Sequence, residues 1–518
     1  MPNTKRFAIL LFFGFLIHAL IISKLIYYYL SPLTYNSYNT QPKHKHQIID
    51  RNNIVLASTN TLYSAYIDPT DSDMQTVLAK LEHALPDLDL AKIISRWDQK
   101  TRFIWLERHI ENPSTLEQLA IPGVHLIQDT KRIYPYSKSA AHLIGFTDCE
   151  HIGLAGLEYH FDQHLTTQPL QLTIDIRVQT IVHHLLQEGM EHFQANAANA
   201  ILININTGEI LAYVSLPSYD THNPVPNSDD TQEHSPLFDR NALGVYEFGS
   251  VLKVSNLAFA LNSNKYNLST SINIPAYIHY GRFKISDFGD NNPKNISLLN
   301  AFLRSSNKAN ALLALELGSQ PQRAFLEQLG YFSPINLSFT IAKSLFPKKW
   351  SIGTTITSSF GYGIAISSLH LIQGFARLIT GRKIELSLIK TNDNKIFDQF
   401  LPKHVSEQVQ YALRQCVLVG YAKKAGVDKL FVGAKTGTAN LLDKKGKYLE
   451  GKNRVTAIAG FPLLSTNELH KEQFALVVCL ENPKASKETF GFATAGWIAA
   501  PIAKNIIEKI APILGIYK

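Results

Sequence analysis

The chain has 518 residues, which is too long for one compact core and predicts two or three domains. Its hydrophobic fraction of 45% and charged fraction of 18% are ordinary for a globular protein and exclude wholesale disorder. The net charge of +8 is mild and the Lys and Arg residues are scattered, so we expect a solvated surface and no nucleic-acid partner. The three cysteines share no metal-ligand spacing, so we expect neither a disulfide framework nor a metal site, and no cofactor.

The N-terminal segment predicts a membrane anchor over residues 1–30. Phe7–Ile22 is apolar apart from one histidine, and Leu25–Leu30 extends the run to a length that spans a bilayer. The alternative is a cleaved signal peptide, but Tyr27–Leu30 offers no small-residue cleavage site and suits a membrane interface. The basic residues before the span predict a cytoplasmic N-terminus, with everything after the span outside.

Residues 31–167 predict a spacer, or pedestal, domain of mixed α/β structure. Short alternating runs and polar turns follow one another here, without a set of residues that would carry chemistry. The clusters Asp50-Arg51-Asn52 and Gly156-Leu157-Glu158 stand out, and their arginine and glycines indicate turns and ion pairs.

Residues 168–518 predict one α+β domain, because strands at both ends surround a helical middle and favour an antiparallel sheet. Val178–Phe193 has helical spacing, and Ala200–Ile205 and Ile210–Leu216 flank an Asn-Thr-Gly turn that predicts a β-hairpin. The other predicted elements are helices over Ile296–Leu317 and Ala499–Ile513 and strands over Phe431–Ala439, Val455–Phe461 and Phe474–Leu480.

A candidate nucleophile stands at Ser250, where a polar loop runs into an apolar stretch and we expect a helix to begin. Lys253 follows one helical turn later, so its amine can reach the serine hydroxyl. Serine is nearly inert at neutral pH and needs a base, which a lysine of lowered pKa can supply. The same spacing also occurs at Ser305 and Ser387, so it does not select the nucleophile by itself.

Two downstream motifs select Ser250. Ser305-Ser306-Asn307 and Lys435-Thr436-Gly437-Thr438 follow it in the order of the three-part pattern of penicillin-binding proteins and serine β-lactamases. The lysine and threonines of the second motif would bind a carboxylate, and its glycine would let a substrate backbone approach the strand edge. The amide hydrogens of Ser250 and Thr438 would form an oxyanion hole. This set indicates acyl transfer from a peptide that ends in a free carboxylate.

With these motifs the chain resembles the class B penicillin-binding proteins, and within them the division-specific D,D-transpeptidases, from the anchor to the C-terminus. Glu247, before the glycine of the nucleophile turn, is similar to the division type, because elongation-type relatives more usually carry proline there. The resemblance extends to Asp50-Arg51-Asn52, Gly156-Leu157-Glu158, Leu172-Thr173-Ile174-Asp175, Arg240-Asn241 and Gly361-Tyr362-Gly363.

The resemblance implies a penicillin-binding, β-lactamase-like transpeptidase domain in the periplasm that crosslinks peptidoglycan. Ser250 would attack the penultimate D-Ala carbonyl of a stem peptide with Lys253 as its base. Ser305 would relay the proton to the leaving amine, and Asn307 would orient the peptide. The implied partners are stem peptides, β-lactams that acylate the same serine, the inner membrane, and other membrane proteins of division or cell-wall synthesis.

The chain departs from the family pattern at several positions. Phe248 precedes the glycine of the nucleophile turn where the family usually has proline, and we expect Phe248→Pro to leave acylation intact. In the first spacer cluster, Lys45-His46 and Asn53 stand where Arg-Gly and Gly are typical. These departures concern loop rigidity and spacer packing rather than the catalytic set.

Several alternative functions remain open at this point. A class A β-lactamase needs a deacylating glutamate with an asparagine four residues on, which no glutamate of the helical middle has. A D,D-carboxypeptidase would differ only in using water as acceptor, and an elongation-type transpeptidase only in where it acts. A penicillin-binding scaffold of the division complex would keep the motifs without turnover.

Overall fold

The computed structural model describes residues 44–516, apart from 72, 85–87, 99–102, 111–113, 115–120, 225–234, 282, 288, 290–293, 392–396, 444–445 and 464–471. The predicted membrane anchor over residues 1–30 therefore lies outside the described residues. Among the helices that are described, none combines the length and the apolar character needed to cross a bilayer.

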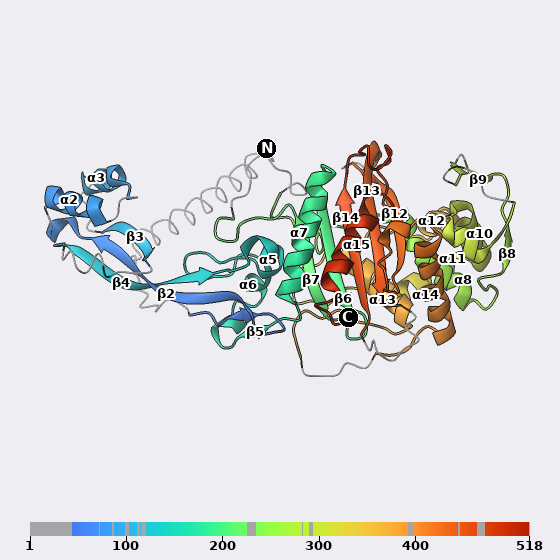
Figure 1. The fold of residues 1–518 in the computed structure, drawn as a ribbon, viewed down its shortest axis with the longest axis horizontal. Helices are drawn as coiled ribbons and strands as arrows, with labels where there is room; N and C mark the ends of the chain where they lie inside the picture. The colour runs from blue at the N-terminus through green and yellow to red at the C-terminus, as the bar shows by residue number, and fades with distance from the viewer. Residues whose placement is uncertain are drawn as a thin grey trace, which may run out of the picture. The chain divides into compact units, whose positions relative to one another are not determined.

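A five-stranded sheet forms the centre of the C-terminal part of the chain (Figure 1). Its order is β12-β13-β14-β6-β7 and each neighbouring pair is antiparallel, which confirms the predicted α+β architecture. Every residue of β6 is buried, as is β14 up to its last residue, as expected for strands covered on both faces. The strands are β6 (Ala197–Asn204), β7 (Ile210–Leu216), β12 (Gly433–Leu442), β13 (Tyr448–Phe461) and β14 (Phe474–Glu481).

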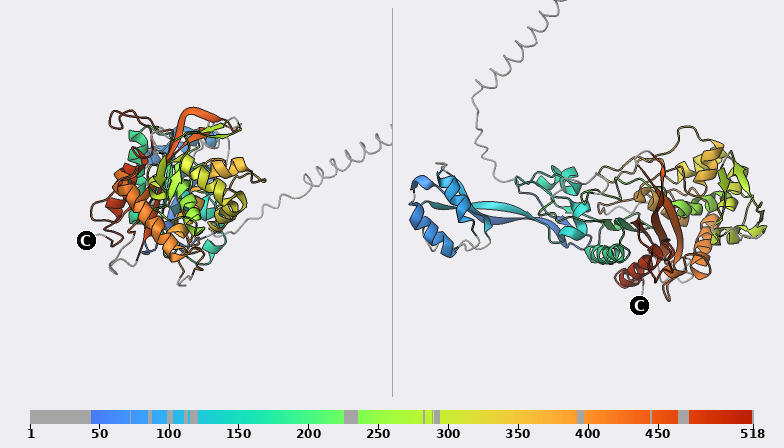
Figure 2. Two further views of the ribbon diagram at one scale, coloured as in Figure 1. Left: turned by 90° about the vertical axis from the view of Figure 1, so that its right-hand side faces the viewer. Right: turned by 90° about the horizontal axis from the view of Figure 1, so that it is seen from above.

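Helices cover both faces of this sheet (Figures 1 and 2). α7 and α15 pack on each other and on one face, whereas α13 and α14 pack on the other face with α8 against both of them. α8 is buried from Lys253 to Leu261 and lies inside the core, with its polar residues Lys253, Ser255 and Asn256 buried as well. These helices are α7 (Ile176–His192), α8 (Lys253–Asn262), α13 (Ser368–Thr380), α14 (Lys403–Leu418) and α15 (Ala499–Ile510).

The predicted helix over Ile296–Leu317 is wrong in one respect, because the chain breaks it at Ser305. Residue 305 has a φ of 54°, in the left-handed region that a non-glycine residue seldom adopts. β11 (Asn295–Ser297), α9 (Leu298–Leu303) and α10 (Asn307–Leu317) replace the single helix. The neighbouring elements are α11 (Ser319–Gln328), α12 (Ile352–Ser358) and the short strands β8 (Ser271–Asn273), β9 (Ile278–Tyr280) and β10 (Phe283–Ile285).

The N-terminal part of the described chain builds a second sheet around the long strand β2 (Val55–Ile67). β1 (Ile48–Ile49) pairs with the start of β2, β4 (Val124–Ile133) pairs with it from Ser58 onward, and β3 (Ile104–Ile110) pairs with it from Tyr63 onward. β5 (Leu170–Gln171) pairs in parallel with β1. The remaining helices here are α2 (Met74–Ala84), α3 (Leu90–Asp98), α5 (Ser137–Ile144) and α6 (Gly156–His160).

This spacer contains two cores rather than one. Its distal part has a small apolar cluster of its own, in which Ala65, Ile67 and Ile104 pack with residues of α2 and α3. Ile48 and Leu157 instead belong to the large apolar cluster of the C-terminal part. The base of the spacer is therefore packed as an extension of the sheet domain.

A buried charged cluster stabilises the base of the spacer. Lys45 Nζ lies 3.0 Å from Glu158 and 2.6 Å from Asp162, and Arg132 Nε donates to the other oxygen of Glu158 at 2.7 Å. The side chains of Lys45 and Glu158 are wholly buried. Each buried cation thus faces a carboxylate. The predicted ion pair of the arginine in Asp50-Arg51-Asn52 is confirmed by Glu209, which lies 3.4 Å from Arg51.

Two departures from the family pattern have a local explanation in the spacer. Lys45 keeps a positive charge opposite Glu158 although the family usually has arginine there. Asn53 has a φ of 65°, and asparagine tolerates this region better than other non-glycine residues. The carboxylate of Asp50 caps the same turn by accepting from the backbone N–H groups of Asn52 and Ile54.

Candidate active site

Ser250 lies in a short 3₁₀ turn, Gly249–Leu252, that runs directly into α8. The prediction that a helix begins at the serine is therefore confirmed, with one turn of tighter winding first. Within this turn Ser250 is half-buried, whereas its three neighbours are buried. Gly249 has a φ of 54°, and a Cβ there would lie 2.9 Å from the carbonyl oxygen of Thr438. The turn thus packs on strand β12 and presents the serine.

Lys253 is wholly buried and points its amine at the second motif. Its Nζ donates to Ser305 O at 2.6 Å, to Ser305 Oγ at 3.1 Å and to Asn307 Oδ1 at 2.7 Å. Among the described residues it makes no ion pair with a carboxylate and no hydrogen bond to Ser250. Burial lowers the pKa of Lys253 well below its usual value, and the nearby charge of Lys435 lowers it further. The lowered pKa favours the neutral amine, which has two hydrogens to donate and a lone pair that can act as a general base.

The break between α9 and α10 places Ser305 between two lysines. Its hydroxyl lies 3.1 Å from Lys253 Nζ and 3.3 Å from Lys435 Nζ. A continuous helix would move Ser305 away from one of the two lysines. The left-handed φ of Ser305 therefore keeps its hydroxyl within reach of both amines. Strained backbone of this kind is common at catalytic centres.

Ser306 and Asp287 hold the start of α10. Ser306 is the N-cap, and its hydroxyl accepts from Ala309 N at 3.0 Å and donates to Asp287 at 2.8 Å. Asp287 also accepts from the backbone N–H of Lys308 at 3.0 Å. Sequence reasoning missed Asp287, because it lies in a region without a recognisable motif. The pattern of a serine N-cap before an apolar helix could have predicted the start of α10.

Lys435 extends from β12 into the same cluster. It is 2% exposed, and its amine donates to the backbone oxygen of Thr436 at 2.9 Å as well as to Ser305. Burial lowers the pKa of Lys435 to about 8. The two lysines therefore share one hydroxyl, and the charge of Lys435 lowers the pKa of Lys253.

Gly437 is needed for a different reason from the one predicted. A Cβ on it would lie 2.4 Å from the carbonyl oxygen of Phe248 and 2.8 Å from the backbone nitrogen of Val251. The missing side chain therefore lets the nucleophile turn, rather than a substrate, approach β12. On the same strand, Thr438 Oγ1 accepts from Ala495 N at 3.1 Å, which leaves its hydroxyl hydrogen available to a ligand.

The third serine with the SxxK spacing lies elsewhere. The backbone N–H of Ser387 donates to Gly208 O at 2.9 Å, and its hydroxyl donates to Ile389 O. Lys390 donates to the backbone oxygen of Arg51 at 3.0 Å. Both residues thus join the loop of the β6–β7 hairpin to the spacer, and neither contacts the candidate catalytic residues.

A groove of about 640 Å³ borders the candidate site, because Asn307 is one of its lining residues. Tyr362, Gly363 and Asn440 also line it. Its lining combines hydroxyl groups with apolar side chains, as in Thr354, Thr357, Ile356 and Phe360. A groove of this composition suits an extended peptide.

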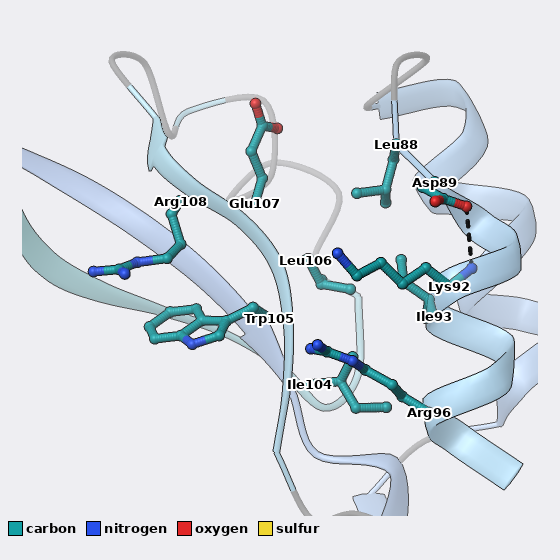
Figure 3. A pocket seen from close by; sticks show the side chains of 10 residues that line it. All are labelled: Leu88, Asp89, Lys92, Ile93, Arg96, Ile104, Trp105, Leu106, Glu107 and Arg108. Atoms are coloured by element: carbon teal, nitrogen blue, oxygen red, sulfur yellow. Dashed lines mark hydrogen bonds between the residues drawn. The ribbon is translucent and has the colours of Figure 1, made fainter. Parts of the chain in front are cut away.

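A second pocket, of about 530 Å³, lies in the distal spacer between α3 and β3 (Figure 3). Lys92 and Arg96 point from α3 toward β3, above the apolar side chains of Ile104 and Leu106, while Arg108 points away from α3 (Figure 3). None of the candidate site residues lines this pocket in the described part of the chain. It is separate from the catalytic cluster.

Two family models match the chain. The penicillin-binding protein transpeptidase domain matches residues 198–508, and the penicillin-binding protein dimerisation domain matches residues 46–169. Among curated relatives, the probable peptidoglycan D,D-transpeptidase FtsI of Caulobacter vibrioides is 30% identical over 90% of this chain and 81% of its own length. The peptidoglycan D,D-transpeptidase FtsI of Escherichia coli K12 is 28% identical, over 80% and 73% of the two chains.

A further relative is the stage V sporulation protein D of Bacillus subtilis, which is 25% identical over 99% of this chain and 86% of its own length. The transpeptidase model covers more than half of the 518 residues and contains all three sequence motifs. With the buried Lys253–Ser305–Lys435 cluster beside Ser250, these matches establish that the chain belongs to the penicillin-binding protein transpeptidase family, as a class B member of the division type.

Proposed function

We propose that this protein is a D,D-transpeptidase that crosslinks peptidoglycan stem peptides through a serine acyl-enzyme during division. The observation that carries the proposal is the Ser305 hydroxyl, held 3.1 Å from one buried lysine amine and 3.3 Å from another, with one of these lysines a single helical turn after Ser250. A neutral amine, a relay hydroxyl and a positive charge are what peptide acyl transfer requires.

Ser250 Oγ attacks the carbonyl carbon of the penultimate D-Ala while the neutral amine of Lys253 takes the hydroxyl proton. The oxyanion that develops accepts from the N–H groups of Ser250 and Thr438, whose segments pack directly on each other. Ser305 passes a proton to the departing nitrogen, the C–N bond breaks and D-Ala leaves. The amine of a second stem then attacks the ester, which frees Ser250 and forms the crosslink.

The carboxylate of the terminal D-Ala binds the protonated amine of Lys435 and the hydroxyls of Thr436 and Thr438. Asn307, whose amide oxygen accepts from Lys253 and whose amide nitrogen donates to Ser286 O at 3.0 Å, orients the peptide. The remainder of the donor stem lies along the groove that begins at Asn307. A β-lactam carries a carboxylate next to a strained amide and acylates the same serine.

Residues 1–30 anchor the protein in the inner membrane with the N-terminus in the cytoplasm and the catalytic domain in the periplasm. The apolar run and the preceding basic residues support this topology. The spacer, residues 31–167, and the anchor then face the other membrane proteins of division. The catalytic domain extends over residues 168–518.

Covalent labelling with fluorescent penicillin tests the nucleophile. Using full-length protein in detergent, we expect the adduct to map to Ser250. Ser250→Ala abolishes labelling, Ser305→Ala slows it strongly with the adduct still on Ser250, and the distant control Ser387→Ala changes nothing. An adduct on Ser305 or Ser387 would overturn the assignment, and folded wild-type protein without any adduct would favour a scaffold.

The acceptor is tested by supplying a stem-peptide amine to the acyl-enzyme. A transpeptidase releases a crosslinked dimer at the expense of the hydrolysed product as the amine concentration rises. Release of hydrolysed product alone, at every amine concentration, would show a D,D-carboxypeptidase instead.

A further inference from the structure

Glu247 stands just before the nucleophile turn, and its carboxylate holds two segments that come from elsewhere in the chain. Oε1 accepts from the backbone N–H of Gly363 at 2.6 Å. Oε2 accepts from the hydroxyl of Tyr448 at 2.9 Å. Gly363 follows α12, and Tyr448 begins β13. One side chain thus joins three separate segments.

The loop Gly361–Gly363 also lies directly on the nucleophile turn. Gly249 N donates to Gly361 O at 3.1 Å, and Tyr246 and Ile366 exchange both backbone hydrogen bonds, at 2.8 and 3.0 Å. Gly361 has a φ of 90°, and a Cβ on it would lie 1.9 Å from the carbonyl oxygen of Gly249. Backbone contact therefore sets the distance between loop and turn, and Glu247 fixes the loop one residue beyond Tyr362.

The segments that Glu247 joins form one wall of the groove. Tyr362 and Gly363 line it, and the ring of Tyr362 meets the ring of Tyr448 edge to face at 5.8 Å between centroids. Glu247 itself contacts neither Lys253 nor the Ser305 hydroxyl in the described part of the chain. Its half-buried carboxylate has two donors, and both would lose their partner if the carboxylate were removed.

We propose that Glu247 is a positioning residue for acylation, which ties the Gly361–Gly363 loop and the start of β13 to the nucleophile turn so that Ser250 and the groove wall keep a fixed spacing. This inference rests on the proposed function, because it concerns the rate at which Ser250 is acylated. A displacement of about 1 Å at a reacting group can cost roughly 10²-fold in rate.

The test separates the limiting acylation rate from the apparent dissociation constant for penicillin, both measured by stopped flow on the full chain. Glu247→Ala should lower the limiting rate roughly 10- to 100-fold and leave the dissociation constant within about threefold. Glu247→Gln keeps an oxygen for Gly363 and places an amide N–H opposite the Tyr448 oxygen, so it should restore most of the rate. Tyr448→Phe removes only one of the two hydrogen bonds to Glu247, so it should lower the limiting acylation rate less than Glu247→Ala does.

Two matched controls accompany these variants. Tyr411, on α14, is 44% exposed like Tyr448 but has no hydrogen-bond partner among the described residues, so Tyr411→Phe should keep the wild-type rate. Glu450→Gln changes an exposed carboxylate on β13 and should do the same. In the double variant Glu247→Ala/Tyr448→Phe, the loss should equal that of Glu247→Ala alone, because both remove the same contact.

The positioning role would be refuted by a wild-type limiting rate in Glu247→Ala, by a loss confined to the dissociation constant, or by Glu247→Gln as slow as Glu247→Ala. If Glu247→Ala does not fold, Tyr448→Phe decides, because this side chain is exposed at the edge of the domain. A wild-type protein that is never acylated would instead remove the proposed function, whatever the variants do.

Discussion

Two buried clusters of charge in the described part of the chain differ in how their charges are paired. In the spacer, Lys45 and Arg132 each face the carboxylate of Glu158, and Lys45 also faces Asp162. In the sheet domain, Lys253 and Lys435 face the same hydroxyl of Ser305, and neither forms an ion pair with a carboxylate among the described residues. Burial is nearly complete in both places.

The difference in charge pairing distinguishes a cluster that stabilises the fold from a cluster suited to catalysis. Opposite charges in contact compensate the desolvation that burial costs, so the spacer cluster stabilises a fold. Burial lowers the pKa values of both lysines, and the charge of Lys435 lowers that of Lys253 further, against a smaller opposing effect of the Asp287 carboxylate. The lowered pKa of Lys253 favours its neutral form, which is the form that the proposed role as a general base requires.

The largest expected effect comes from removing the base. Lys253→Met replaces a buried amine by an apolar side chain of similar size, so the unfolding midpoint in urea should stay equal or rise. Acylation by penicillin should fall by roughly 10²–10⁴-fold, the usual contribution of a general base. A clear loss of stability together with near-normal acylation would show that Lys253, like Lys45, stabilises the fold and does not act as the base.

The opposite outcome is expected in the spacer. Glu158→Gln leaves Lys45 and Arg132 buried with Asp162 as the remaining carboxylate, so the free energy of unfolding should fall by about 3–5 kcal/mol. The acylation rate per folded molecule should not change. Glu327→Gln, which removes the partner of Arg323 in a solvent-exposed pair, is the control and should shift stability by less than about 0.5 kcal/mol. Equal effects of the two substitutions would contradict the structural role of the spacer cluster.

A third effect concerns the turn that presents the nucleophile. Phe248 is 1% exposed, and its φ of −100° differs from the −65° that proline prefers. The sequence-based expectation for Phe248→Pro concerns acylation, and the packing of the ring adds a separate expectation for stability. We expect a loss of roughly 3 kcal/mol in unfolding free energy from the cavity, and about 1 kcal/mol for Phe248→Leu. Chemical denaturation of both variants measures this loss, and a Phe248→Pro protein as stable as wild type would contradict it. The rate of penicillin labelling tests the separate expectation that acylation stays intact.

The smallest expected effect is a pH dependence. Lys435 must be protonated to attract a carboxylate, and its pKa of about 8 means that this charge is present below pH 8 and lost above it. The second-order acylation rate should therefore fall by up to about tenfold for each pH unit above that value. Lys435→Arg keeps its charge and should show no alkaline decline, even if it is slower. A wild-type rate that stays flat well above pH 8 would mean that the carboxylate is bound without the Lys435 charge.

Much of this protein follows from local sequence pattern. The apolar runs of β6 and β14, the hairpin after Ala200 and the closing helix each have a periodicity that a short window reveals. The three motifs identify Ser250, Ser305-Ser306-Asn307 and Lys435-Thr436-Gly437-Thr438 as a set, because their order along the chain is itself the signal.

The tertiary structure alone determines the contacts between residues that are far apart in sequence. The break at Ser305 replaces a helix that local propensity favours, because the hydroxyl must reach two lysines from different elements. A side chain at Gly437 would collide with the carbonyl oxygen of Phe248, which is distant in sequence. The two hydrogen-bond partners of Glu247 also lie more than a hundred residues away from it in the chain. No sequence window contains such pairs, since they arise only when the sheet brings β12, α8 and α10 together and excludes water from the charges between them.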